Sequence, residues 1–208
     1  MTIGKGTRKI RSDKKVDCQP TISIELKDVI YRISYVIDTP VKDICEAICI
    51  DGMRSRKVLS ELSQHFRRTV RLGNTMYMGD INRPSSQRLY PVGKRERIGI
   101  RFMAHDFENI SSLAFALGVT PSRATALLLD ASIRNSDFIN TYFERYLTRE
   151  LDANRMKELK EVIRFLNKNN PYTERISWLA LLSFLYTEIR GSASTLNETI
   201  AEYIEKWR

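Results

Sequence analysis

Two short stretches of the chain alternate polar or small residues with apolar ones. The clearer stretch runs from Arg97 to Phe102, and the other runs from Thr21 to Leu26. Alternation of this kind predicts a β-strand with one buried face. The residues expected on the buried faces are Ile98, Ile100 and Phe102 in the clearer strand and Ile22, Ile24 and Leu26 in the other. Because the rest of the chain has a helical pattern, the strand at 97–102 is expected to lie outside any large sheet.

Apolar residues at helical spacing occupy most of the remaining chain. Helices are expected before the clearer strand, at Asp28–Ile37, Val41–Ile50 and Ser55–Phe66, with a turn at Asp51-Gly52. Gly73-Asn74 separates two short runs of strand formers, which predicts a hairpin. Residues 83–93 are rich in proline, serine and glycine and are the best linker candidate. Residues 137–208 are again expected to be helical.

Two helices with readable ends follow the strand at 97–102. Gly118 is expected to end the first helix, because glycine readily takes the left-handed conformation found after helix C-termini. Thr120 is the expected N-cap of the second helix, and Pro121 suits the first helical position, where an amide proton is not needed. The apolar residues of the two helices are Phe107, Ile110, Ala114 and Leu117, then Ala124, Leu127, Leu128 and Ala131.

This order of strand, helix, turn and helix, between Arg97 and Asn135, resembles the ribbon-helix-helix family of DNA-binding proteins. The resemblance covers under a fifth of the chain and depends on pattern and turn chemistry. In that family two chains each contribute one strand to an antiparallel ribbon that enters the DNA major groove, and four helices form the dimer core. The resemblance therefore implies a homodimer with double-stranded DNA as its partner. It also explains a lone strand, which needs a partner strand to satisfy its backbone groups.

The resemblance also implies which residues contact DNA. Arg97, Gly99 and Arg101 would face the bases, because arginine can bond guanine at two atoms and glycine allows a close approach. The implied phosphate contacts are Lys94 and Arg95 beside the ribbon and Thr120, Ser122 and Arg123 at the start of the second helix. That helix start corresponds to the phosphate clamp of the family, where free amides and the helix dipole face a phosphate.

The expected fold class is mostly α with short β segments, an α+β protein whose ribbon-helix-helix core is flanked by helical regions. The expected divisions are a flexible basic arm at 1–17, an N-terminal accessory region at 18–82, the linker at 83–93, the ribbon-helix-helix core at 94–136 and a helical C-terminal region at 137–208. Three interpretations of residues 18–82 are open. They are a degenerate second copy of the motif, in which Thr39-Pro40 matches Thr120-Pro121, a winged helix-turn-helix, and a helical accessory domain.

Charge and composition favour a nucleic-acid partner. The formal net charge is +9, from 34 Lys and Arg against 25 Asp and Glu, which predicts an anionic partner, with a membrane surface as the second choice. No signal-peptide pattern is present and the densest apolar stretch is too short to span a bilayer, so a cytoplasmic protein is expected.

Neither a metal site nor an enzyme site is expected. Cys18, Cys45 and Cys49 are an odd number of thiols, and burial is favoured for them over metal binding with His65. The chain has two histidines, no glycine-rich phosphate loop and no nucleophile elbow, so neither an enzyme nor a cofactor is expected.

The function expected from these observations is sequence-specific regulation of transcription through double-stranded DNA. By analogy with large ribbon-helix-helix proteins, the regulated genes would belong to a conjugative plasmid or another mobile element. The extra helices offer surface for RNA polymerase, which favours an activator over a repressor. The alternatives are an accessory DNA-binding protein of a relaxosome or partition complex, and a membrane-surface or RNA-binding helical protein whose arginines act by general electrostatics.

Overall fold

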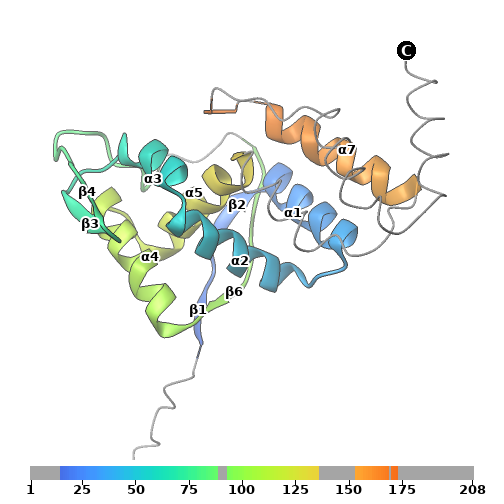
Figure 1. Cartoon of the computed structure of the whole chain (residues 1–208), viewed down its shortest axis with the longest axis horizontal. Helices are drawn as coiled ribbons and strands as arrows, with labels where there is room; N and C mark the ends of the chain where they lie inside the picture. The colour runs from blue at the N-terminus through green and yellow to red at the C-terminus, as the bar shows by residue number, and fades with distance from the viewer. Residues whose placement is uncertain (1–14, 89–92, 136–152, 169, 173–208) are drawn as a thin grey trace, which may run out of the picture.

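The computed structural model describes residues 15–88, 93–135, 153–168 and 170–172, which form a mixed α+β protein (Figure 1). Residues 1–14 of the expected basic arm and most of residues 137–208 lie outside this part of the chain. The elements in chain order are β1 (Val16–Cys18), β2 (Thr21–Ser23), α1 (Ile24–Ile37), α2 (Val41–Arg54), α3 (Arg56–Ser63), β3 (Val70–Leu72), β4 (Thr75–Tyr77), β5 (Arg95–Arg97), β6 (Ile100–Phe102), α4 (Ala104–Leu117), α5 (Pro121–Arg134) and α7 (Ala153–Asn167).

The strand segment around residues 95–102 pairs with the N-terminal segment of its own chain. β1 is antiparallel to β6, with Asp17 opposite Arg101, and β2 is antiparallel to β5, with Thr21 opposite Arg97. Partner numbers add up to 118 in both pairs, so the register is continuous and the four strands form one interrupted ribbon. The interruption falls at Pro20, which has no backbone N–H to donate, although its carbonyl oxygen still accepts from the Ile98 N–H at 3.1 Å. We call this pair of segments, 16–24 and 94–102, the ribbon.

Two strand–helix–helix units of the chain correspond at a constant spacing. The helices α1 and α4 both have 14 residues, and their first residues, Ile24 and Ala104, differ by 80 in number. The helices α2 and α5 also both have 14 residues, and their first residues, Val41 and Pro121, differ by 80 as well. The left-handed residues that end α1 and α4 follow the same spacing, Asp38 at φ 54° and Gly118 at φ 67°. The chain therefore contains the same local design twice.

Contacts between corresponding positions indicate that a pseudo-twofold axis relates the two units. In the ribbon, the register places Gln19 opposite Gly99, and these numbers differ by 80. In the helices, a Cβ atom added at Gly52 would lie 2.0 Å from the Ser132 Oγ atom, and these numbers also differ by 80. Residues that face their own counterparts lie on a twofold axis, as in an isologous contact between identical subunits. The axis thus passes through the centre of the ribbon and the crossing of α2 and α5.

One continuous core joins the two units. Buried residues of both units belong to a single cluster, among them Ile30, Ile48, Phe102, Leu113 and Leu128. The cluster also contains Leu159 of α7, which lies along α1 in Figure 1. Within the described residues no single helix is long and apolar enough to cross a membrane, and only the pair α4 and α5, bent by 93°, passes that test by length and composition.

The structure corrects two sequence expectations near the first unit. The strand expected at Thr21–Leu26 ends at Ser23, because the Ser23 side chain accepts a hydrogen bond from the Leu26 N–H and caps α1. The turn expected at Asp51-Gly52 lies inside α2. Gly52 is needed there because any side chain at this position would collide with Ser132. The hairpin at Gly73-Asn74 is confirmed as β3 and β4.

Candidate nucleic-acid interface

The two faces of the ribbon differ sharply in exposure. Ile98, Ile100 and Phe102 are 5%, 1% and 0% exposed, which confirms the inward face expected from the sequence. The N-terminal segment supplies further inward residues, Cys18 and Ile22, both 3% exposed. The outward positions are polar, small or charged. They are Asp17, Gln19, Thr21 and Ser23 on one segment and Arg95, Arg97, Gly99 and Arg101 on the other.

The two arginines expected to read bases lie in different surroundings. Arg97 is exposed, faces Thr21 across the ribbon, and has no ion-pair partner among the described residues. Arg101 is also exposed, but its Nε atom donates to the Asp17 carboxylate at 2.7 Å. Both side chains of this pair are 67% exposed, so the pair is worth little to stability. It nevertheless neutralises the charge at that end of the ribbon.

Gly99 at the ribbon centre is open to solvent. A Cβ atom added there would meet no atom within 4 Å, so the position tolerates a side chain in the free protein. Its opposite residue, Gln19, is exposed and carries an amide that can both donate and accept hydrogen bonds. The centre of the ribbon can therefore approach another surface closely from the Gly99 side.

Lys94 and Arg95 extend the basic character of the ribbon beyond Arg97. Both are exposed, and the carbonyl oxygen of Lys94 accepts from the Ile24 N–H at 3.1 Å, which continues the ladder by one position. The intervening Glu96 pairs with Lys27 of α1, and this hydrogen bond raises the pKa of Lys27. Because Glu96 is engaged with Lys27, it does not offset the charge of the neighbouring arginines.

The start of α5 is covered by the segment that the sequence marks as a linker. The Thr120 N–H donates to the Gln87 Oε1 atom at 2.8 Å, and the Arg123 Nε atom donates to the Ser86 carbonyl oxygen at 3.0 Å. Arg123 is only 6% exposed. Ser122 is half-buried and lies 3.7 Å from the Cys18 sulfur of β1. The phosphate role expected for Arg123 stays a prediction, and the side chain is buried with its Nε atom bonded within the protein.

The three thiols are buried, as expected from the sequence. Cys45 and Cys49 are 0% exposed in α2, and burial raises the pKa of Cys45 to about 12. His65, which could have joined them as a metal ligand, is exposed. In the described part of the chain no three His, Cys, Asp or Glu side chains form a group that could hold a metal ion.

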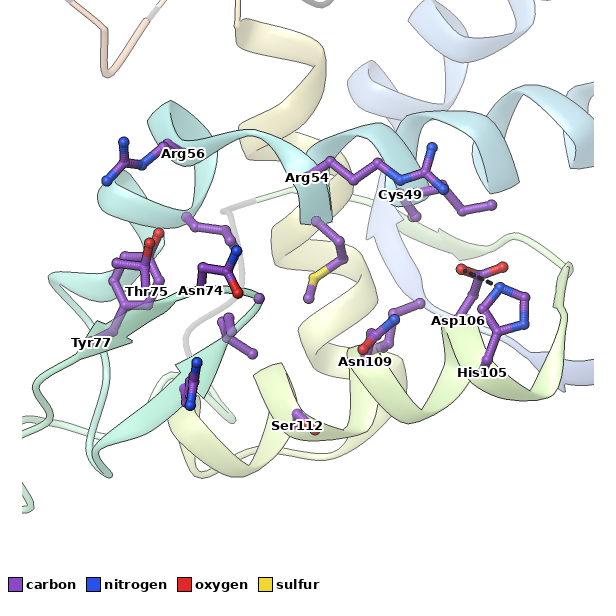
Figure 2. A pocket seen from close by; sticks show the side chains of 17 residues that line it. Cys49, Arg54, Arg56, Asn74, Thr75, Tyr77, His105, Asp106, Asn109 and Ser112 are labelled. Atoms are coloured by element: carbon purple, nitrogen blue, oxygen red, sulfur yellow. Dashed lines mark ion pairs between the residues drawn. The ribbon is translucent and has the colours of Figure 1, made fainter.

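A separate hollow has no ribbon residue in its lining. It has a volume of about 630 Å³ and is bounded by α2, α3, the β3–β4 hairpin and α4. Figure 2 shows Arg54 and Arg56 on one side of this hollow and Asn109 and Ser112 of α4 on the other. The ion pair between His105 and Asp106, at 3.2 Å, lies in the first turn of α4, at one end of the hollow.

Sequence reasoning missed part of the ribbon's outer face. Asp17 and Gln19 belong to it, whereas Thr21 lies in the second strand that the sequence predicted, and the alternation of exposed and buried residues begins at Asp17. The signal that could have shown this is the 80-residue spacing between the two units, which the residue types hide. A comparison of the chain with protein-family models, with curated proteins and with solved structures finds no match.

Proposed function

We propose that this chain is a sequence-specific double-stranded DNA-binding regulator of transcription, and that it reads the major groove with a ribbon built within one chain. The observation that carries the proposal is the ribbon itself, two antiparallel segments whose inner face is buried on helices and whose outer face is open. A two-stranded ribbon is one of the few elements that the major groove admits. The arrangement of two strand–helix–helix units about one axis supports a single-chain form of the ribbon-helix-helix fold.

The chemistry of the outer face suits DNA. Arg97 and Arg101 carry guanidinium groups that can bond the O6 and N7 atoms of guanine, and Gly99 between them allows the backbone to come close to the bases. Lys94 lies at one end of the ribbon, where it would contact a phosphate. The net charge of +9 adds the general attraction that draws a protein to DNA.

A homodimer is not needed to form this ribbon. The expectation of a dimer came from a strand without a partner, and here both strands belong to one chain. In our proposal each chain binds one site as a unit. The proposed homodimer consists of two such chains bound at neighbouring DNA sites.

The remaining parts of the proposal concern the cell. We propose a cytoplasmic protein that controls genes of a conjugative plasmid or another mobile element, with helices outside the two units, such as α7, as the contact for RNA polymerase. Support for this part is the analogy with large ribbon-helix-helix proteins stated above and the chain length beyond the two units. An accessory protein of a relaxosome or partition complex would use the same DNA interface.

The test is a binding map across host and plasmid DNA, followed by titration of the best duplex and a random duplex. Arg97→Ala should reduce the preference between the two by about 5- to 100-fold, as expected when one arginine–guanine contact is lost. Lys94→Ala is the matched control, and should weaken binding to both duplexes alike. Raised salt should weaken all binding while the preference persists. If Arg97→Ala lowered both affinities equally, the ribbon would not be reading bases.

Transcription is tested separately by a reporter placed beside the mapped site. A regulator should change the transcript level of the reporter, and Arg97→Ala should remove that change. Binding without any change in transcripts would favour the relaxosome or partition role.

A further inference from the structure

We infer that one chain recognises an asymmetric DNA site, because the two ends of its ribbon carry different chemistry. This inference rests on the proposed function and specifies its DNA target. A ribbon made by two identical chains would present the same residues on both sides of its twofold axis, and so would favour a palindrome. Here the axis relates residues that differ.

Corresponding outward positions show how the two ends differ. Under the 80-residue spacing, Arg97 corresponds to Asp17, and Arg101 corresponds to Thr21. Even the two residues at the centre differ, Gln19 facing Gly99. No outward position of the ribbon near the axis has the same residue on both sides.

One end of the ribbon, formed by β2 and β5, is basic. Its outward residues are Thr21 and Ser23 opposite Arg97 and Arg95, and they include no carboxylate. Glu96, the acidic residue on β5, is paired with Lys27. We call this the basic end. Its Arg97 can bond a guanine on the base pairs beneath it.

The other end, formed by β1 and β6, has no net charge. Asp17 and Arg101 form an ion pair at 2.7 Å, and Lys15, the next outward residue, pairs with Glu46 of α2. We call this the paired end. An aspartate accepts a hydrogen bond from the N4 amino group of cytosine, whereas an unpaired carboxylate near guanine O6 or a phosphate is repelled. The paired end therefore favours a C·G pair, where Asp17 meets cytosine and Arg101 meets guanine.

The separation of the ends sets the spacing within the site. Arg97 and Arg101 are four residues apart on one extended segment, which is about 13 Å at the rise of a strand. This distance is about four base pairs of DNA at 3.4 Å each. The inferred site is thus a short asymmetric sequence with guanine under Arg97 and a C·G pair about four positions away.

The experiment is selection of binding sites from a random duplex library by the full-length protein. We expect a non-palindromic sequence, bound by one chain per duplex as measured by native mass spectrometry. A second protein, Asp17→Arg with Gln19→Gly and Thr21→Arg, would carry the same outward Arg-Gly-Arg pattern on both segments. Its selected sequence should become palindromic. Asp17→Asn alone, which replaces the carboxylate that accepts from cytosine N4, should lower the preference for a C·G pair at the paired end by about 5-fold or more.

The possible results separate the inference from the proposed function. A palindrome selected by the natural protein would overturn the asymmetry while leaving base reading intact. The same would hold if the triple variant, shown by circular dichroism to be folded, kept the natural asymmetric sequence. Equal binding of all duplexes by the natural protein would overturn base reading itself and the inference with it.

Discussion

A disulfide across the centre of the ribbon would show that both segments belong to one chain. The variant is Gln19→Cys with Gly99→Cys. Backbone hydrogen bonds from Ile24 to Lys94 and from Ile98 to Pro20 mark hydrogen-bonded pairs, so alternation makes Gln19 and Gly99 a non-hydrogen-bonded pair. Side chains in such pairs are close enough for a disulfide, and a Cβ atom at Gly99 meets nothing within 4 Å.

The stabilisation follows from the length of the loop that the bond closes. The two positions are 80 residues apart, and loop-closure entropy for such a loop predicts about 4.5 kcal/mol. Denaturant unfolding of the oxidised and reduced variant measures this difference. A value of about 2 kcal/mol or more would agree with a bond formed at small strain.

The assay for connectivity is oxidation at low protein concentration, followed by a non-reducing gel and peptide mapping. We expect a monomeric product with residue 19 linked to residue 99. The control variant, Gln19→Cys with Arg101→Cys, joins a diagonal pair about 7–8 Å apart and should oxidise poorly. Disulfide-linked dimers as the main product would refute the intrachain ribbon, since the two segments would then come from different chains.

Three further predictions concern the core and the ribbon. Gly52→Ala should lower the free energy of unfolding by about 1–3 kcal/mol through collision with Ser132, and adding Ser132→Ala should recover part of that loss in denaturant titrations. Ile100→Asp should unfold the protein, as measured by circular dichroism, because it buries a carboxylate in the core, whereas Gly99→Ser should stay folded and change only the proposed DNA binding. A folded Ile100→Asp protein would mean that the two faces of the strand are reversed. Burial raises the pKa of the Cys45 thiol from 9.0 to about 12. The contribution of this neutral thiol to the free energy of unfolding is therefore complete below pH 9 and is lost between about pH 9 and 12, by about 1.4 kcal/mol per pH unit. The free energy of unfolding should therefore fall less steeply with pH in Cys45→Ala than in the natural protein. Equal slopes would contradict the raised pKa of Cys45.

The sequence alone predicted the second unit well because local chemistry decides it. The alternation at Ile98, Ile100 and Phe102, the left-handed Gly118 and the Thr120-Pro121 helix start are each readable over a few residues. The first unit was harder to recognise. Its strand is interrupted by Pro20, and an aspartate takes the left-handed position that glycine holds in the other unit. A degenerate second copy was one of the three sequence interpretations, through Thr39-Pro40 and Thr120-Pro121, but the constant 80-residue spacing of the helices is visible only in the structure.

The burial of Arg123 could not be predicted from its position at a helix start. A basic residue there is equally suited to a phosphate and to a neighbouring loop. The structure favours the loop, because Ser86 and Gln87 bring a carbonyl oxygen and a side-chain amide to the first turn of α5. Such a contact joins residues more than 30 positions apart, and the linker composition of residues 83–93 gives no sign of it.

Joining both units in one chain permits residue pairs on the axis that a homodimer cannot have. In a homodimer each axis position faces an identical residue. Two glycines at the crossing of α2 and α5 would leave a gap, and two serines would collide, whereas Gly52 against Ser132 allows close contact. The same freedom extends to the ribbon, where Asp17 and Arg101 form an ion pair on one side of the axis and Thr21 faces Arg97 on the other. Because the units are covalently joined, neither the crossing nor the ribbon depends on protein concentration, as it would in an obligate dimer.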